Sequence, residues 1–149
     1  MQNKHKSQPV FNGKNLRVGV VTARFNKAIT KELERSALEA LKKNKVGAKK
    51  IKVVSVAGCV EIPYALLKMA ETKKYDCLVA IGCVVRGETP HFDYVAKMVQ
   101  EGVLEVSLEE SIPIGFGVLT VNTVEQAEER YHVGGEAAAA AIEGALLVV

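Results

Sequence analysis

Short apolar segments rich in β-branched residues alternate with helical segments along almost the whole chain. The strand-like segments are "LRVGVVT" (16–22), "IKVVSVA" (51–57), "CLVAIGCVV" (77–85) and "IGFGVLTV" (114–121). The third is too apolar to have a solvent-facing side, which favours a parallel sheet buried on both faces. The helices are predicted at 26–45, 62–74, 90–110 and 136–147, and a Thr123–Gln126 capping box starts another short helix. This alternation predicts an α/β fold: a single-domain, three-layer αβα sandwich with a four-stranded parallel sheet.

The predicted elements form one domain over residues 15–149, preceded by a flexible N-terminal arm at 1–14. A chain of 149 residues can bury roughly two-thirds of its unfolded surface in one core. No apolar run reaches the ~20 residues of a membrane span, and the N-terminus lacks the apolar part of a signal peptide. Cys59, Cys77 and Cys83 form no C-x-x-C pair, which favours reduced thiols over disulfides or a zinc site. We therefore expect a cytoplasmic protein without a membrane partner.

Charge is unevenly distributed along the chain. Residues 1–52 carry fourteen Lys and Arg against three Glu, whereas residues 53–149 carry six against fourteen acidic residues. A basic segment can mark a nucleic-acid surface. Here the lysines fall on the polar face of a predicted helix and on its flanks, without interleaved aromatic residues. This pattern favours a solvated face, so we expect no nucleic-acid partner.

Unusual residues follow all four predicted strands. The segments are "TARFN" (22–26), "AGCVEIP" (57–63), "VVRGETPH" (84–91) and, beyond the fourth strand, "EQAEER" (125–130). The carboxyl ends of parallel strands meet at one edge of the sheet, where ligands bind in open α/β folds. Together, the four segments predict a single ligand site at that edge.

The third segment has the features of an anion site. Thr89 suits a helix N-cap and Pro90 the first helical position, which would leave the amides of His91 and Phe92 unpaired. Such amides and the helix dipole attract an anion such as phosphate. His91 could donate a proton beside it. Equally, Thr89 and Pro90 could merely start a helix, with His91 facing solvent; the stretch alone does not decide between the two.

Three charged side chains bear on this anion site. The Glu88 carboxylate would repel an anion unless it points away. Arg86 could offset that charge, or could pair with another acid in a structural role. Arg130 is a second candidate cation, and its local alternative is a helix-end arginine on a solvated face.

Other candidates also have structural alternatives. Phe25 could stack on a planar ligand, and Phe116 lies between two glycines that permit a close backbone approach; core packing is the alternative for both. Glu61 could cap a helix start or accept hydrogen bonds from ligand hydroxyls. Cys59 near a helix start could have a lowered pKa and act as a nucleophile with His91. That pair would make the chain a cysteine-dependent hydrolase.

With these segments in place, the chain from Leu16 to its C-terminus resembles the lumazine synthase family. The most specific stretches are "GCVVRGETPHFDYV" (82–95) and "FGVLTVNTVEQAEER" (116–130), supported by "AGCVEIP" (57–63). The resemblance implies a flavodoxin-like fold and a transferase of the penultimate step of riboflavin biosynthesis. Its substrates would be 5-amino-6-(D-ribitylamino)uracil and 3,4-dihydroxy-2-butanone 4-phosphate, and its products 6,7-dimethyl-8-ribityllumazine, phosphate and water. Neither a cofactor nor a metal is implied.

The resemblance also implies a set of site residues. His91 would transfer protons and Arg130 would clamp the phosphate as catalytic residues. The substrate-binding residues would be Phe25, Asn26, Gly58, Cys59, Val60, Glu61, Cys83, Val84, Val85, Gly87, Glu88, Thr89 and Phe116. Among them Phe25 would stack on the pyrimidine, Glu61 would hold the ribityl chain, the backbone at 84–85 would meet the pyrimidine edge, and residues 87–89 would cradle the phosphate.

Family members assemble as pentamers, some of which form icosahedral shells, and the residue corresponding to Phe116 reaches the neighbouring subunit's site. The resemblance therefore implies a homo-pentamer with shared active sites. The chain departs from the family at Cys59, where Ala or Ser is common, and at Pro90, where Thr is frequent. After Arg130, "YHVGGE" replaces a longer lysine-containing loop, so positive charge is missing there unless His132 supplies it. A flavin-binding carrier and a structural shell protein with a basic segment for cargo are the non-enzymatic alternatives.

Overall fold

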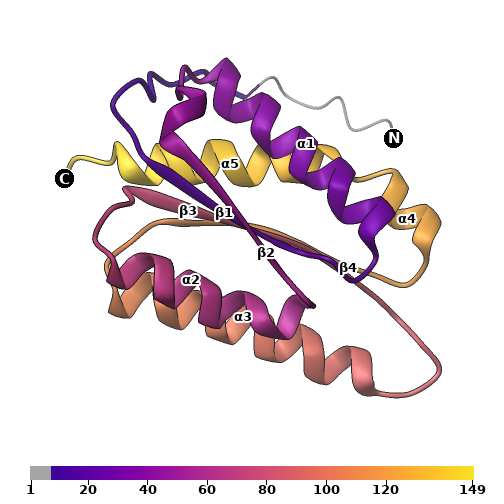
Figure 1. Ribbon diagram of the computed structural model, residues 1–149. Helices are drawn as coiled ribbons and strands as arrows, with labels where there is room; N and C mark the ends of the chain where they lie inside the picture. The colour runs from indigo at the N-terminus through magenta and orange to yellow at the C-terminus, as the bar shows by residue number, and fades with distance from the viewer. Residues whose placement is uncertain (1–7) are drawn as a thin grey trace.

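The computed structural model describes residues 8–149 and shows a sheet of four parallel strands (Figure 1). Their order is β2-β1-β3-β4. The strands are β1 (Val18–Ala23), β2 (Ile51–Val56), β3 (Cys77–Val85) and β4 (Ile114–Val121). The predicted α/β fold with a four-stranded parallel sheet is confirmed. The predicted bounds of β3 and β4 are also confirmed.

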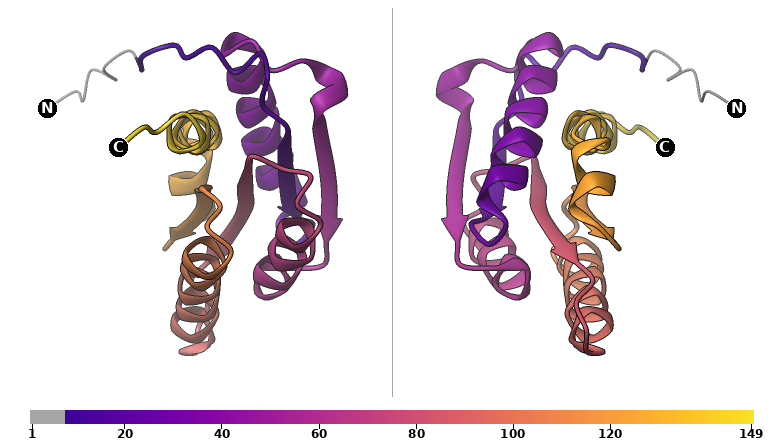
Figure 2. Two further views of the ribbon diagram at one scale, coloured as in Figure 1. Left: turned by 90° about the vertical axis from the view of Figure 1, so that its left-hand side faces the viewer. Right: turned by 90° about the vertical axis from the view of Figure 1, so that its right-hand side faces the viewer.

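Helices cover both faces of the sheet. Figures 1 and 2 show α1 and α5 packed on one face and α2 and α3 on the other. The helices are α1 (Lys27–Lys43), α2 (Ile62–Glu71), α3 (His91–Glu109), α4 (Val124–Glu128) and α5 (His132–Ala145), with 3-10 turns η1 (Ala48–Lys50) and η2 (Cys59–Glu61). The predicted three layers are therefore confirmed.

Each face of the sheet has its own apolar core. Successive side chains of a strand point to opposite faces, so Val20 packs with α1 and α5 while Val21 packs with α2 and α3. On α1, the apolar residues at four-residue spacing, Ile29 and Leu33 among them, are buried against the sheet as the periodicity predicts. Strand β3 is buried over Cys77–Cys83, which confirms that it has no solvent-facing side.

The last helix starts earlier than predicted. We expected it at 136–147, but α5 begins at His132 and ends at Ala145. The prediction was wrong because two glycines, Gly134 and Gly135, weaken the local tendency to form a helix. In the folded protein Gly134 lets α5 approach the backbone of α1, where a side chain would overlap the carbonyl group of Leu33. Packing against α1 therefore overrides the local preference.

The capping box at the start of α4 is confirmed. The Thr123 hydroxyl accepts a hydrogen bond from the Gln126 amide at 3.2 Å. The side-chain oxygen of Gln126 accepts bonds from the amides of Asn122 at 2.7 Å and Thr123 at 3.3 Å. The chain therefore turns sharply after β4 at a point held by one glutamine side chain.

The end of the N-terminal arm is attached to the C-terminus of α1. The Asn44 side chain accepts a hydrogen bond from the Phe11 amide, and the Asn44 carbonyl accepts one from Gly13, both at 2.7 Å. Residues 1–7 of the predicted arm lie outside the described residues, so its flexibility stays a prediction. None of the helices in residues 8–149 combines the length and the apolar character needed to cross a membrane.

Candidate active site

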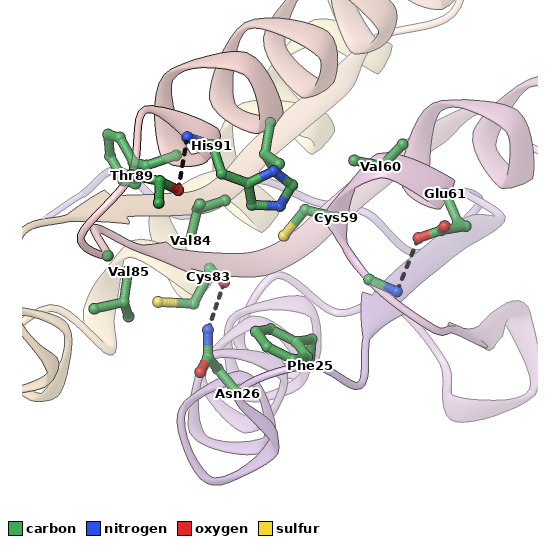
Figure 3. A pocket seen from close by; sticks show the side chains of 14 residues that line it. Phe25, Asn26, Cys59, Val60, Glu61, Cys83, Val84, Val85, Thr89 and His91 are labelled. Carbon is green, nitrogen blue, oxygen red and sulfur yellow. Dashed lines mark hydrogen bonds between the residues drawn. The ribbon is translucent and has the colours of Figure 1, made fainter.

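The carboxyl ends of the strands surround a cavity of about 330 Å³, within the size range of small-molecule sites. They point to the right-hand side of Figure 1, and Figure 3 shows the cavity from close by. The cavity is lined by Phe25, Asn26, Gly58, Cys59, Val60, Glu61, Cys83, Val84, Val85, Gly87, Thr89, His91, Phe92 and Val95. All predicted site residues line it except Glu88, Phe116 and Arg130.

The turn after β1 presents an aromatic ring at the edge of the cavity. The amide of Phe25 donates to the Ala57 carbonyl at 3.0 Å, which joins this turn to the end of β2. The Phe25 side chain is 72% exposed, so the alternative of a core-packed ring is wrong. A ring held at the rim with its face open to solvent is suited to stacking on a planar ligand.

Asn26 holds the same turn against β3. Its backbone is left-handed, with φ 61° and ψ 46°, a conformation that Asn tolerates better than most residues. Its side-chain amide donates to the Cys83 carbonyl at 3.0 Å. The residue stands at the N-cap of α1, yet its side chain joins the ends of β1 and β3 instead of capping the helix.

Glu61 both caps and faces the cavity. One carboxylate oxygen accepts a hydrogen bond from the Gly58 amide at 3.0 Å (Figure 3). This bond confirms the capping interpretation. Within residues 8–149 the second oxygen has no hydrogen-bonding partner, so it can accept bonds from the hydroxyl groups of a ligand.

The start of α3 differs from the prediction by one residue. Pro90, not Thr89, is the N-cap, and α3 begins at His91. The expected N-cap position at Thr89 was wrong by one residue, because Pro90 has ψ 5° and has not entered the helix. The Thr89 hydroxyl instead accepts from the His91 amide at a long 3.5 Å. That amide is thus weakly held, and the Phe92 amide has no hydrogen bond among the described residues.

Of the charged side chains beside this helix start, neither Glu88 nor Arg86 lines the cavity. Gly87 and Thr89 line the cavity while Glu88 between them does not, so the Glu88 carboxylate is not part of the cavity wall. Arg86 pairs with Asp93 at 3.4 Å and not with Glu88. Of the two roles considered for Arg86, the structural pairing with another acid is confirmed.

The three thiols are in their protonated form at neutral pH. Burial raises the pKa of Cys59 to about 11; a backbone hydrogen bond from Cys83 lowers it, and the charge of Glu61 raises it further. Burial likewise raises the pKa of Cys83 to about 11 and that of Cys77 to about 12. The expected lowered pKa of Cys59 was therefore wrong, and a Cys59 nucleophile lacks its thiolate.

We expect all three thiols to resist alkylation in the folded protein. With the pKa of Cys59 near 11, iodoacetamide at pH 8 should modify it roughly 100-fold more slowly than in the urea-unfolded chain. The rate should rise about tenfold per pH unit and level off only near pH 11. Mass spectrometry of the alkylated protein measures this directly, with the unfolded chain as the control. Rapid modification of Cys59 at pH 7, with loss of activity, would instead support the hydrolase alternative.

Two predicted residues lie away from this cavity. Phe116 borders a separate apolar groove between β4 and α3 and is 42% exposed. Arg130 follows α4, where its guanidinium donates to the Gln126 carbonyl at 2.7 Å and lies 3.7 Å from Glu129. His132, at the start of α5, lies 4.0 Å from Glu136 and does not line the cavity either. A single chain therefore leaves the cavity without the predicted phosphate clamp.

Two lining residues, Phe92 and Val95, were not among the predicted substrate-binding residues, although the Phe92 amide was expected at the anion site. Both lie on the first turns of α3 close to His91. Val95 lies four residues after His91, so helical spacing could have placed it on the same helix face. Phe92 follows His91 directly, and spacing alone does not place its side chain there. The lining of the cavity therefore combines apolar side chains with polar groups.

Among residues 8–149, no group of three or more His, Cys, Asp or Glu side chains is arranged to hold a metal ion.

The comparison with protein families agrees with the geometry of the cavity. The family model described as 6,7-dimethyl-8-ribityllumazine synthase matches residues 15–148. The match covers nearly the whole chain and includes every strand and helix that contributes to the cavity. The chain belongs to the lumazine synthase family, whose members condense a ribitylaminouracil with butanone phosphate in riboflavin biosynthesis.

Proposed function

We propose that this cavity is the site of the condensation, with both substrates held at the carboxyl edge of the sheet. The observation that supports it is the convergence of three strand ends and the start of α3 on one cavity. Holding two reactants together in aligned positions is the main source of rate in such a reaction. The protein needs no cofactor for it, because the amine and the ketone supply the reactive groups.

The uracil ring would occupy the side formed by β1, β2 and β3. The exposed ring of Phe25 is placed to stack on it. Backbone groups at Val84 and Val85 would meet the polar edge of the uracil, since β3 ends there and its last residues are only partly buried. The free carboxylate oxygen of Glu61 would accept hydrogen bonds from the ribityl hydroxyls, while Asn26, Gly58, Cys59, Val60 and Cys83 shape the surrounding wall.

Butanone phosphate would occupy the side formed by the loop before α3. The unpaired Phe92 amide and the weakly held His91 amide supply hydrogen-bond donors at a helix N-terminus. Gly87, Glu88 and Thr89 would wrap the phosphate with their backbone, the Glu88 carboxylate pointing away from it. His91 would stand beside the reacting carbons.

The chemistry follows from these positions. The 5-amino group attacks the ketone of butanone phosphate and forms an imine with loss of water. The hydroxyl-bearing carbon beside the imine then loses a proton, phosphate leaves from the next carbon, and the resulting enol becomes a ketone. The ribitylamino nitrogen attacks this ketone and closes the second ring with loss of another water. His91 would move protons in these steps, because the attack and both dehydrations need proton transfer.

The missing clamp would come from a second copy of the chain. Arg130 and Phe116 both lie outside the cavity of their own chain and are partly exposed. In a closed ring of identical copies each chain would give Arg130 and Phe116 to one neighbour and receive them from the other. We propose a homo-pentamer with sites between copies; whether pentamers form a larger shell is decided by the measured particle mass.

Complementation between two strongly impaired variants tests this shared site. Chains carrying His91→Ala and chains carrying Arg130→Ala are co-assembled in equal amounts. If sites lie between copies, about a quarter of them combine an intact His91 with an intact Arg130. The mixture should then recover about a quarter of the wild-type rate, far above either variant alone.

The matched control co-assembles His91→Ala chains with chains carrying both substitutions, in which no site has His91. No recovery is expected there. If the first mixture, despite proven co-assembly, shows only the average of the rates of its two components, Arg130 either acts in its own chain's site or takes no part in the reaction.

A further inference from the structure

Arg86 holds the phosphate-side loop without lining the cavity. Its backbone amide donates to the Val121 carbonyl at 2.9 Å, which extends the β3–β4 pairing by one residue. Its side chain then spans the start of α3: Nη2 lies 3.4 Å from the Asp93 carboxylate, and the guanidinium lies 4.3 Å from the centre of the Phe92 ring. The loop between, residues 87–90, therefore has both of its ends tied to one arginine.

The same guanidinium also reaches the end of β4. Its Nε donates to the Asn122 side-chain oxygen at 3.0 Å. The Asn122 amide donates to the Gln126 side chain at 2.7 Å, and the Gln126 carbonyl accepts from Arg130 at 2.7 Å. A continuous series of hydrogen bonds thus joins the loop of the chain's own cavity to Arg130.

The loop has little else to fix its position. Residues 86–91 are exposed. In the part of the chain that the structure describes, the loop's own hydrogen bonds are the long one between Thr89 and His91 and a 3.0 Å bond from Asp93 to the Pro90 carbonyl. A β-carbon added at Gly87 would meet no atom within 4 Å. The contacts of Arg86 therefore carry most of the loop's placement.

We propose that Arg86 is a positioning residue that sets the phosphate-binding loop relative to His91 and, through Asn122 and Gln126, relative to Arg130. The proposal rests on the proposed function, in which residues 87–89 bind phosphate in the chain's own cavity and Arg130 binds the phosphate held by a neighbouring copy. Arg86 acts by the shape of its guanidinium, because Nε donates to Asn122, Nη2 donates to Asp93, and the planar group lies over the Phe92 ring. Its charge is not aimed at the substrate.

The test compares Arg86→Met, Arg86→Lys and Asn122→Ala with the control Lys97→Met, which removes an exposed lysine of α3 lying 3.9 Å from Glu101. Arg86→Met should raise KM for butanone phosphate and lower kcat. As a result, kcat/KM for this substrate should fall by about tenfold to a hundredfold. KM for the ribitylaminouracil should stay within about twofold. The Arg86–Asp93 pair is exposed, so Tm should fall by about 4 °C or less.

Arg86→Lys separates shape from charge. Lysine keeps the positive charge but loses the planar fork and the stacking face, so it should behave like methionine. Wild-type kinetics of Arg86→Lys would mean that charge alone matters and would overturn the proposal. In the double variant Arg86→Met with Asn122→Ala, the free-energy losses calculated from kcat/KM should be clearly less than additive. Full additivity would show that Arg86 and Asn122 act independently.

Inhibition by inorganic phosphate distinguishes this proposal from the proposed function. Phosphate should compete with butanone phosphate in the wild-type protein. Arg86→Met should raise the inhibition constant of phosphate by about the same factor as it raises KM for butanone phosphate. Competition that is equally strong in Arg86→Met would leave the phosphate site in place and overturn only the role of Arg86. If phosphate does not compete in the wild-type protein, the assumed phosphate site itself is wrong.

Discussion

Replacing Gly134 by alanine is expected to lower the Tm of the protein by about 6–12 °C. In an ordinary exposed helix the same change would stabilise by roughly 1 kcal/mol, because alanine has the higher helix propensity. Here a β-carbon at Gly134 would overlap the backbone oxygen of Leu33 and lie 2.8 Å from its carbonyl carbon. Backbone cannot move aside as a flexible side chain can, so α5 must shift away from α1.

The shift should lower the free energy of unfolding by at least ~3 kcal/mol, the upper end of the usual range for overpacking. The effect is large because α1 and α5 together cover one face of the sheet. Thermal unfolding followed by circular dichroism measures the effect. Gly47→Ala is the control, because its φ is −68° and no atom lies within 4 Å of an added β-carbon. It should be neutral or slightly stabilising. A Gly134→Ala protein as stable as the wild type would show that α1 and α5 are not in this contact.

The second large effect is on the chemistry. His91→Ala is expected to reduce kcat by about 10²–10⁴-fold, the usual contribution of a positioned proton-transfer group. Activity should not vanish, because substrate alignment by the rest of the cavity remains. Steady-state kinetics with each substrate varied in turn measures this loss.

The His91 side chain is exposed at the first position of α3, so its removal should leave Tm nearly unchanged. Lys97→Met, an exposed change on the same helix, should retain wild-type turnover. Unchanged turnover in His91→Ala would contradict its assigned role and would return it to the alternative of a solvent-facing helix start.

The sheet was predictable from the sequence because its signal is local. The apolar run 77–85 is bounded by polar residues, and its bounds match β3. Helix ends were less predictable, since they depend on contacts between distant segments. At the start of α5 the close approach to Leu33 outweighs the local effect of the glycines.

The cavity was likewise predictable in outline. Parallel strands bring their carboxyl ends together, so segments far apart in the sequence could be assigned to one site before the structure was known. The protonated state of the Cys59 thiol could not be predicted from the sequence, because its raised pKa comes from burial by several segments. The location of Arg130 outside the cavity of its own chain was not predictable either, since it depends on how the segment after β4 folds.

Mixing the purified protein with both substrates tests the central claim most directly. The account predicts that the absorbance of 6,7-dimethyl-8-ribityllumazine appears with the release of one inorganic phosphate per molecule formed, and that both signals require both substrates. A folded protein that binds the product or a flavin tightly, but forms no lumazine and releases no phosphate from the two substrates, would contradict the account and identify the cavity as that of a carrier.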